Sequence, residues 1–384
     1  MLISDNHSQM TPNATTPTDY TSALLNVSIF STVSPPAAQW TAVPIFTLII
    51  FLLVLLVNAT VLYVFYANPH LRTPFTIYLI NLFSANIIIA LLQNPLDVLF
   101  ELYGRWTFGH VACSLYLYGS YAVSGGTMVC HVVISANRIW AIVFPLHYRL
   151  HHSKRVAVWI CVGIWGYVHV LIVPGLVMDG LWYRQPLEKL GCQVNMETQT
   201  AWSGAVHWLI YNIAEIFVVG AYPFIWYFRK KSRKVTNLSD SKPSSKPSDE
   251  ANTTLPRVDT IISLETMAPP APPKPRSDRA RAYSMTITII KQKENTHAFT
   301  MLTFLTCSVA LCWTPIMVFY GLAPYMGFPP VFYPLARGIY ALQAVADPIV
   351  FTLALREVWN AFVEMGRSMV RSKRRPSTVP TVTT

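Results

Sequence analysis

Residues 43–66 read VPIFTLIIFLLVLLVNATVLYVFY and contain no Asp, Glu, Lys or Arg. About 20 consecutive apolar residues form a helix that crosses the hydrocarbon core of a bilayer, where lipid offers the backbone no hydrogen-bond partner. Six more apolar stretches follow, at residues 75–96, 114–137, 156–178, 201–228, 298–336 and 332–355. The sequence therefore predicts an all-α membrane protein with a seven-transmembrane helix bundle at residues 43–366.

The overall composition supports a membrane protein. Of the 384 residues, 53% are apolar and 12% are charged, whereas a soluble domain is about 25% charged. This argues against an ordinary cytosolic enzyme. The net charge is +11, but 14 of the 29 Lys and Arg residues lie in one polar segment, at positions 229–293. Because nucleic-acid-binding proteins carry basic residues on a folded face, we expect no nucleic-acid partner.

Basic residues distinguish the two ends of the predicted helices. Cytoplasmic loops carry an excess of Lys and Arg, and one set of helix ends holds Arg72, Arg149, Lys154, Arg155, Arg229, Lys230, Lys231, Lys291, Lys293 and Arg356. This set is predicted to be cytoplasmic, which places residues 1–42 outside the plasma membrane. They lack the basic start and apolar core of a cleavable signal peptide. They contain three N-glycosylation sequons, at Asn6, Asn13 and Asn26.

Two polar segments are predicted to be disordered and cytoplasmic. Residues 230–297, the third cytoplasmic loop, are rich in Ser, Pro, Lys and Thr, and residues 367–384 form a similar tail. Neither segment can bury an apolar core. Each places a serine downstream of an arginine, Ser284 in the loop and Ser377 in the tail. Basophilic kinases recognise this pattern, so we expect phosphorylation at both serines.

The cysteines predict one disulfide. Four of the six lie within apolar stretches, where a small apolar role suits them. Cys113 lies at the outer start of the third helix, and Cys192 lies in the outer loop after the fourth. Only these two face an oxidising compartment, so we expect them to pair.

A stripe of polar residues runs along the third helix. Arg138 lies at its cytoplasmic end, and His131, Thr127, Ser124 and Ser120 precede it at helical spacing. Strongly polar residues within a membrane are costly and indicate function. The stripe either joins packed helices by hydrogen bonds or lines a functional interior. Its length and its terminal arginine favour the second interpretation.

Prolines interrupt two of the predicted helices. Pro315 follows Trp313 in the sixth helix, and Asp347-Pro348 precedes Phe351 in the seventh. Proline removes a backbone hydrogen bond and kinks a helix. Kinked helices around a polar interior suit a bundle that has two packings of similar energy.

These features, taken in order, resemble a rhodopsin-like (class A) G-protein-coupled receptor over about residues 43–364. The matching motifs are Asn58, Trp106-Thr-Phe-Gly109, Asn137-Arg138-Ile139 in place of Asp-Arg-Tyr, Pro145-Leu146, Trp165, Cys312-Trp-Thr-Pro315, and Asp347-Pro-Ile-Val-Phe351 in place of Asn-Pro-x-x-Tyr. The resemblance implies a receptor rather than an enzyme, with no cofactor or metal. It also implies a short amphipathic helix after the seventh span.

The resemblance further implies the partners and the residues that couple to them. The partners would be an extracellular ligand, a heterotrimeric G protein, arrestin, receptor kinases and the lipid bilayer. G-protein activation through movement of the sixth helix would involve Asn137, Arg138, Pro145, Leu146, Trp313, Pro315, Asp347, Pro348 and Phe351. A polar core would consist of Asn58, Asn86, Thr127 and Asp347.

Departures from the family pattern occur at these same positions. The family's second-helix Asp is Asn86 here, and its seventh-helix Asn is Asp347. The carboxylate therefore stands on the seventh helix instead of the second. Sodium binding beside it stays an open alternative. The acid beside Arg138 is replaced by Asn137, and the sixth-helix acid is replaced by Asn295, with Glu294 adjacent. These substitutions favour a divergent, invertebrate branch.

The ligand class is constrained by exclusion. Amine receptors of this family carry an Asp where this chain has Ser120, which disfavours a monoamine. No Lys occurs between Lys293 and Lys373, which excludes retinal bound as a Schiff base. Glu215 either anchors a cationic ligand group or hydrogen-bonds a neighbouring helix. Aromatic residues suit peptide side chains, so a neuropeptide-like ligand is favoured, with contacts from Ser120, Tyr121, Ser124, Trp208, Tyr211, Glu215, Trp313, Tyr320 and Tyr340.

Three other classes of protein are alternatives to a signalling receptor. A transporter would show an internal repeat, and none is visible. A membrane enzyme is disfavoured, because His131, His169 and His207 lie on three separate helices without paired carboxylates. A non-signalling decoy or scavenger receptor stays open because the Arg138 motif is altered. A nucleotide-exchange assay separates a decoy from a signalling receptor.

Overall fold

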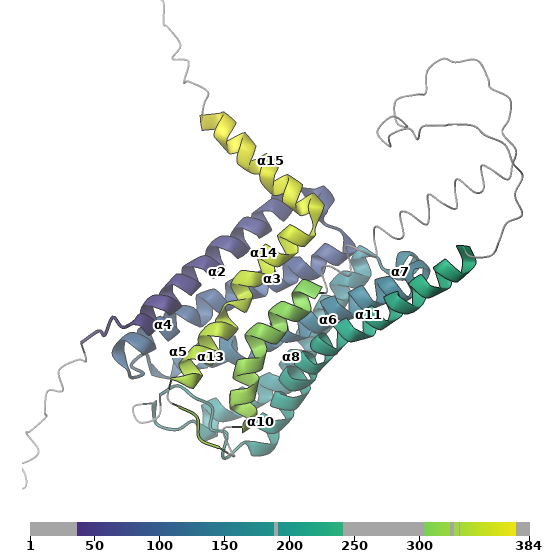
Figure 1. The fold of residues 1–384 in the computed structure, drawn as a ribbon. Coiled ribbons are helices and arrows are strands. Elements are labelled where there is room, and N and C mark those ends of the chain that lie inside the picture. Colours follow the sequence, from purple (N-terminus) through teal and green to yellow (C-terminus); the bar gives the residue numbers. More distant parts are fainter. Residues whose placement is uncertain (1–36, 188–190, 241–302, 323–325, 330, 374–384) are drawn as a thin grey trace, which may run out of the picture. The chain divides into compact units, whose positions relative to one another are not determined.

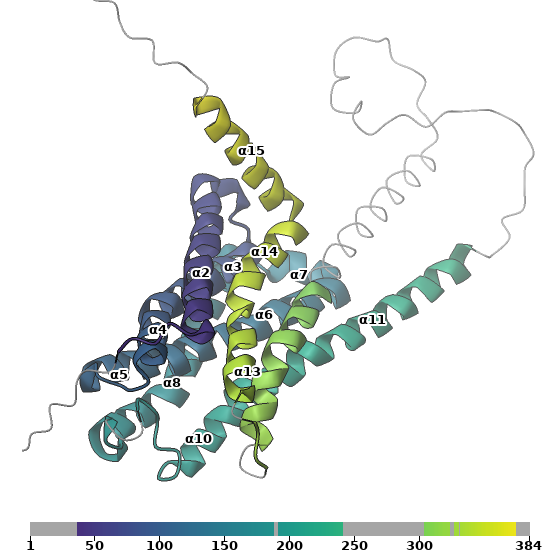
Figure 2. The same cartoon turned by 60° about the vertical axis from the view of Figure 1, so that its left-hand side comes forward.

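The computed structural model describes residues 37–187, 191–240, 303–322, 326–329 and 331–373. The chain divides into two compact units, Met1–Gln39 and Trp40–Thr384. All helices of the described residues belong to the second unit. They pack side by side as a bundle (Figures 1 and 2), and these residues contain no strand.

The predicted seven-transmembrane bundle is confirmed. Among the residues that the structure describes, six helical segments are long and apolar enough to cross a bilayer: Ala42–Ala67, Pro74–Tyr103, Gly109–Val143, Lys154–Tyr183, Thr200–Phe228 and Thr303–Leu322. The seventh is Phe332–Ala354, which passes the same test together with Arg356–Arg367, from which it is bent by 98°. Sequence predicts such spans well, because only continuous apolar helices satisfy their own backbone groups in lipid.

Several spans consist of more than one labelled helix (Figure 1). The first span is α2 (Ala42–Ala67), and the second combines α3 (Pro74–Leu92) with α4 (Asn94–Tyr103). The third span combines α5 (Gly109–Leu117), η3 (Tyr118–Val123) and α6 (Ser124–Val143), and the fourth combines α8 (Lys154–Met178) and η4 (Asp179–Tyr183). The fifth combines α10 (Thr200–Val206), η5 (His207–Asn212) and α11 (Ile213–Asp240), the sixth is the unlabelled helix Thr303–Leu322, and the seventh combines α13 (Phe332–Ala341) and α14 (Gln343–Ala354). Short helices η2 (Pro69–Leu71) and α7 (Pro145–His151) lie between spans.

Local sequence accounts for where the spans begin and end. Thr73 caps α3 in a capping box with Thr76, and Pro74 occupies the first turn, where its missing N–H is not needed. Ser153 accepts a hydrogen bond from the Val156 N–H at the start of α8. Gly104 ends α4 at φ 65°, a left-handed conformation that favours glycine.

The centre of the bundle is closely packed. Helices α2, α3, α6, α8, α11 and α14 pack against one another there. Trp165 on α8 approaches α6 at Gly126, where a Cβ atom would lie 2.7 Å from the indole ring. The Trp165 indole N–H also donates to Asn81 Oδ1 at 2.9 Å. A side chain at position 126 would therefore force these helices apart.

The ends of two helices depart from simple expectation. α11 continues to Asp240, beyond position 230 where the loop was expected to begin, and residues 230–240 contain neither Pro nor Gly to stop it. The helix expected after span seven is α15 (Arg356–Lys373), which turns away from α14 (Figure 2). It continues past position 367, where the disordered tail was predicted to begin. Val358 packs into the core, whereas Trp359 is exposed.

Candidate functional site

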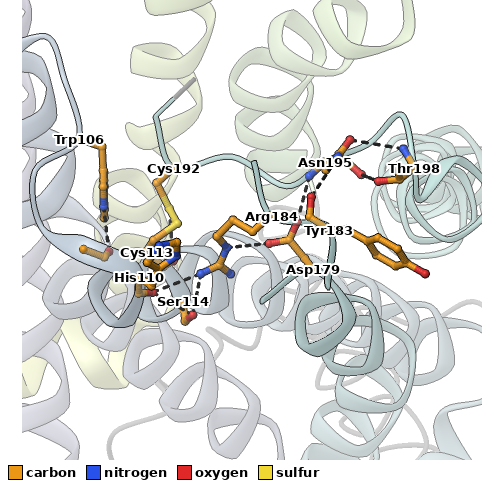
Figure 3. Close-up of polar contacts among 11 residues, drawn as sticks. Trp106, His110, Cys113, Ser114, Asp179, Tyr183, Arg184, Cys192, Asn195 and Thr198 are labelled. Carbon is orange, nitrogen blue, oxygen red and sulfur yellow. Dashed lines mark hydrogen bonds and ion pairs between the residues drawn. A yellow bond between two sulfur atoms is a disulfide. The ribbon is translucent and has the colours of Figure 1, made fainter. Parts of the chain in front are cut away.

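The predicted disulfide between Cys113 and Cys192 is present, with a Cα–Cα distance of 5.5 Å. It ties the segment after the fourth span to the start of α5 and lies next to the network of Figure 3. We call this the disulfide end of the bundle. The opposite end, which holds Arg138, is the Arg138 end.

An ion pair organises the segment before Cys192 (Figure 3). Arg184 Nε donates to Asp179 Oδ2 at 2.9 Å, and both side chains are buried. The same guanidinium donates to Ser114 Oγ at 2.9 Å and to the His110 carbonyl at 3.2 Å. Asp179 Oδ1 accepts from the Asn195 backbone N–H at 3.0 Å. The network thus connects three segments: the start of α5, η4 and the chain beyond the disulfide.

A cavity of about 800 Å³ opens among α2, α3, α4, α6, α13, α14 and Trp313. It extends from carboxylates on α4 to the polar core at Asp347. Its volume falls within the range of about 300–1,000 Å³ that is typical of ligand pockets. Five of its 30 lining residues are Phe, Trp or Tyr, namely Phe46, Phe100, Trp313, Tyr333 and Tyr340.

The predicted ligand-binding residues divide into two groups. Three of the nine line the cavity: Ser124, Trp313 and Tyr340. The other six are not among its lining residues: Ser120, Tyr121, Trp208, Tyr211, Glu215 and Tyr320. The Glu215 carboxylate accepts from Thr314 Oγ1 at 2.7 Å, which corresponds to the interhelical hydrogen bond considered as its alternative role.

Three charged residues of the cavity were missed by sequence reasoning. Asp97 and Glu101 lie one turn apart on α4, and Arg337 on α13 forms an ion pair with Asp97. One feature of the sequence indicated the two carboxylates: they are spaced i, i+4 just beyond the second apolar stretch, which places them on the same face of a helix. Their partner lies more than 200 positions later, so no local pattern joined them.

His131 lies at the centre of the predicted polar core, although the sequence placed it only in the polar stripe of the third helix. His131 Nε2 lies 3.0 Å from Asp347 Oδ2, and its Nδ1 donates to the Thr127 carbonyl at 2.7 Å. A carbonyl only accepts, so His131 Nδ1 carries a proton. Without a proton, Nε2 and the carboxylate oxygen Oδ2 would both be acceptors, so their contact requires a second proton on one of these two atoms. Gln343 donates to Asp347 Oδ1. Both carboxylate oxygens of the relocated acid therefore have protein partners.

Two further contacts complete this core. Asn86 Nδ2 donates to Asn58 Oδ1 at 3.2 Å, and Asn58 Nδ2 donates to the Ala344 carbonyl at 2.9 Å. Trp313 stands edge-on to His131, with ring centroids 5.0 Å apart. Since Trp313 also lines the cavity, an occupant of the cavity would contact the core directly.

At the Arg138 end, Arg138 has an aromatic partner. Its guanidinium carbon lies 3.2 Å from the centre of the Phe75 ring, and Arg138 Nε makes no hydrogen bond to the described residues. The adjacent Asn137 accepts from Tyr148 Oη at 3.1 Å and contacts His152 Nε2 at 3.1 Å. Asn137 thus bonds to the segment after α6 instead of to Arg138.

Burial alters the chemistry of His152. Burial and, secondarily, the Arg138 charge lower the pKa of His152 from 6.5 to about 4. Tyr78 Oη also lies 3.0 Å from His152 Nε2. With Asn137 Nδ2 as donor, the imidazole nitrogen accepts, and the ring is neutral at physiological pH.

The other predicted coupling residues lie on several elements. Pro145 and Leu146 begin α7, where Leu146 is exposed. Pro315 lies within the helix Thr303–Leu322, and Pro348 lies within α14. Phe351 is buried against Phe83. The predicted sites Asn6, Asn13, Asn26, Ser284 and Ser377, and also Glu294 and Asn295, lie outside the described residues.

Comparison with known proteins gives consistent matches. Residues 57–351 match the family described as 7 transmembrane receptor (rhodopsin family). The chain is 27% identical over 215 residues to the alpha-2B adrenergic receptor of Macroscelides proboscideus, covering 56% of this chain and 54% of that protein. It is 31% identical over 153 residues to the receptor of the same name from Talpa europaea, covering 39% of this chain and 38% of that protein.

A longer alignment joins the chain to a probable G-protein coupled receptor, No18, of Amphibalanus amphitrite. It has 22% identity over 345 residues and covers 83% of this chain and 88% of that protein. The adrenergic alignments are shorter, and the chain spans about half or less of those receptors' lengths. They therefore indicate relatedness within the membrane bundle.

Proposed function

Because the chain belongs to the rhodopsin family of seven-transmembrane receptors, we propose that it binds an extracellular ligand and activates a heterotrimeric G protein. One observation carries this proposal: Trp313 borders the cavity and also packs on the His131–Asp347 pair. A ligand in the cavity thereby contacts a side chain of the polar core that joins α6 to α14.

The proposed ligand is peptide-like. The cavity has room for several side chains, five of its lining residues are Phe, Trp or Tyr, and aromatic rings stack well on peptide side chains. Ser120 stands where amine receptors of this family carry an Asp, so the names of the adrenergic relatives do not transfer their ligand to this chain.

The proposed signal runs from Trp313 to Arg138. Pro315 removes a backbone hydrogen bond near the cavity, which lets the rest of the helix Thr303–Leu322 swing outward. This movement opens a G-protein surface around Arg138 and the exposed Leu146. No Asp or Glu of the described residues forms an ion pair with Arg138, so no carboxylate among them restrains its release.

The membrane placement follows the basic residues. The disulfide end faces outside at the plasma membrane, with glycans at Asn6, Asn13 and Asn26. The Arg138 end faces the cytoplasm, where basophilic kinases phosphorylate Ser284 and Ser377, and where receptor kinases and arrestin are further partners.

The test is a screen of neuropeptides on membranes that contain the full chain, with guanine-nucleotide exchange on a purified heterotrimer as the readout. A concentration-dependent rise in exchange, absent from membranes without the chain, is the expected result. Saturable peptide binding without exchange on any G-protein class would instead establish a decoy receptor.

A further inference from the structure

The cavity has an unequal charge balance at its disulfide end. Asp97 and Glu101 contribute two carboxylates, whereas Arg337 contributes one guanidinium. The remaining acid of the lining, Asp347, already faces His131 in the polar core. One negative charge at the disulfide end is therefore left without a cation among the described lining residues.

The geometry identifies Glu101 as the carboxylate with an unused hydrogen-bond acceptor. Arg337 pairs closely with Asp97, and Asp97 Oδ2 also accepts from Gln93 Nε2 at 3.3 Å. The Arg337–Glu101 distance is 3.8 Å, near the limit for an ion pair. The Glu101 carboxylate accepts a hydrogen bond from the Thr47 side chain, but its Oε2 is shielded from solvent and makes no hydrogen bond to the described residues. Asp97 Oδ1 also lacks a hydrogen bond, but it has Arg337 as its ion-pair partner. A carboxylate in such surroundings gains most from an added cationic donor.

We propose that this carboxylate pair, with Glu101 as its principal contact, binds a guanidinium or ammonium group of the ligand. The proposal rests on the function proposed above and specifies the chemistry of its ligand. A guanidinium provides two parallel N–H donors that match a carboxylate. The cation would thus be recognised by α4, at the part of the cavity wall that faces Arg337.

The alternative is an ion-pair cluster that only ties α4 to α13. A structural cluster would stabilise the bundle but would not select among small cations and neutral molecules. A small charged or neutral probe of the cavity, used without the natural ligand, therefore distinguishes a cation-binding site from a structural ion-pair cluster.

The first measurement uses a cysteine reporter in the full chain in membranes. Asn94→Cys places a thiol on the cavity wall, one turn before Asp97, and Val331→Cys provides a second position in the same wall. Each is reacted with trimethylammonioethyl and with sulfonatoethyl methanethiosulfonate, and reaction of the parent chain is subtracted. The cationic reagent is expected to react faster, after correction for its reactivity with a free thiol in solution.

Charge variants test the source of this preference. Glu101→Gln should lower the cation-to-anion rate ratio by about threefold or more, and Arg337→Gln should raise it, because unit charges act strongly in a partly desolvated site. Glu197→Gln is the matched control, since Glu197 is an exposed carboxylate that does not line the cavity. Surface expression is measured for each variant.

The second measurement tests occupancy by protection of the reporter thiol. The probes are N-acetyl-L-argininamide and its neutral near-isostere N-acetyl-L-citrullinamide, each at about 10 mM, because a single contact supports only weak affinity. Argininamide should slow modification, citrullinamide should not, and Glu101→Gln should abolish the difference. Tyramine is a third probe; stronger protection by tyramine than by argininamide would assign the site to a free amine rather than a basic peptide side chain.

Three results would overturn the proposal: an unchanged rate ratio in Glu101→Gln, equal protection by the charged and neutral probes, or no reaction at either reporter. None of these measurements involves a G protein, so a failure of nucleotide exchange leaves them interpretable. Conversely, strong activation by an uncharged peptide that is insensitive to Glu101→Gln would remove the cation site and leave the receptor function intact.

Discussion

At the residue scale, Asn137 stands where the family pattern has an acid, and none of its hydrogen bonds to the described residues involves the adjacent Arg138 side chain. Its amide bonds with Tyr148 and His152, while Arg138 packs on the Phe75 ring. A cation–π contact of this kind contributes about 0.5–2 kcal/mol. A charge-assisted hydrogen bond is about twice as strong as a neutral one. In this structure Arg138 is therefore held by an aromatic ring, and no carboxylate of the described residues pairs with it.

Asn137→Asp is expected to lower ligand-free nucleotide exchange. Restoring the charge adds about 1 kcal/mol of restraint, which corresponds to about fivefold in a two-state equilibrium. Exchange is measured at matched surface expression. Asn137→Ala removes the same amide contacts without adding charge and should not lower the rate. An unchanged or higher rate in Asn137→Asp would show that the restraint lies elsewhere.

Acid should destabilise the Arg138 end through His152. Its pKa is about 4 in the folded chain, below its ordinary value of 6.5, so the unfolded chain binds the proton more readily. Stability is therefore unaffected above pH 6.5 and falls as the pH drops from 6.5 towards 4. We expect the fall in Tm of the detergent-solubilised chain between about pH 7.5 and pH 5 to be smaller in His152→Gln. Equal falls in both proteins would contradict this assignment.

At the element scale, two kinds of link hold the segment between the fourth and fifth spans. The Cys113–Cys192 disulfide is covalent, and the Arg184–Asp179 pair adds hydrogen bonds to Ser114 and to the Asn195 backbone (Figure 3). Trp106 packs beside Cys113 in the same apolar cluster. The disulfide restricts the unfolded chain, whereas the ion pair sets the path of the folded segment.

Replacing Cys113 or Cys192 by Ser should abolish surface expression or ligand binding, because a disulfide typically contributes about 2–4 kcal/mol. Flow cytometry of an epitope-tagged chain measures expression. Cys307→Ser, which replaces an unpaired exposed cysteine, is the control and should behave like the parent. Normal expression and binding in both disulfide variants would contradict the prediction.

Asp179→Asn should lower the Tm by leaving the buried Arg184 without its counterion, a loss of about 3–5 kcal/mol for a buried pair. The introduced amide oxygen can still accept from the Asn195 N–H, so the effect reports the loss of charge. Adding Arg184→Gln to Asp179→Asn should recover part of the loss. Additive losses in the double variant would show that the two charges act independently.

At the scale of the whole molecule, Trp313 at the cavity and Phe75, on which Arg138 packs, belong to one buried apolar cluster. Trp313 contacts His131, His131 pairs with Asp347, and Phe351 lies one turn beyond on α14 against Phe83. All of these side chains are buried. Closely packed contacts of this type have discrete arrangements, which suits a bundle with two states.

Arg138→Ala should abolish ligand-stimulated exchange and leave ligand affinity within several-fold. The reason is distance: Arg138 is not among the cavity-lining residues, so its loss affects the G-protein surface rather than the ligand site. Radioligand binding and exchange are measured on the same membranes. Full signalling by Arg138→Ala would contradict the proposed coupling role.

The sequence by itself determined the bundle and the disulfide, and its resemblance to the receptor family implied the helix after span seven. The bundle and the disulfide depend on linear properties, namely the length of each apolar stretch and the compartment of each cysteine. Tertiary structure decided which side chains meet. Asp97 and Glu101 face Arg337, and His131 faces Asp347, because each helix has one rotation about its axis in the packed bundle. For the same reason only three of the nine residues predicted to bind ligand border the cavity. Helical periodicity shows which residues share a face, but packing against other helices selects where that face points.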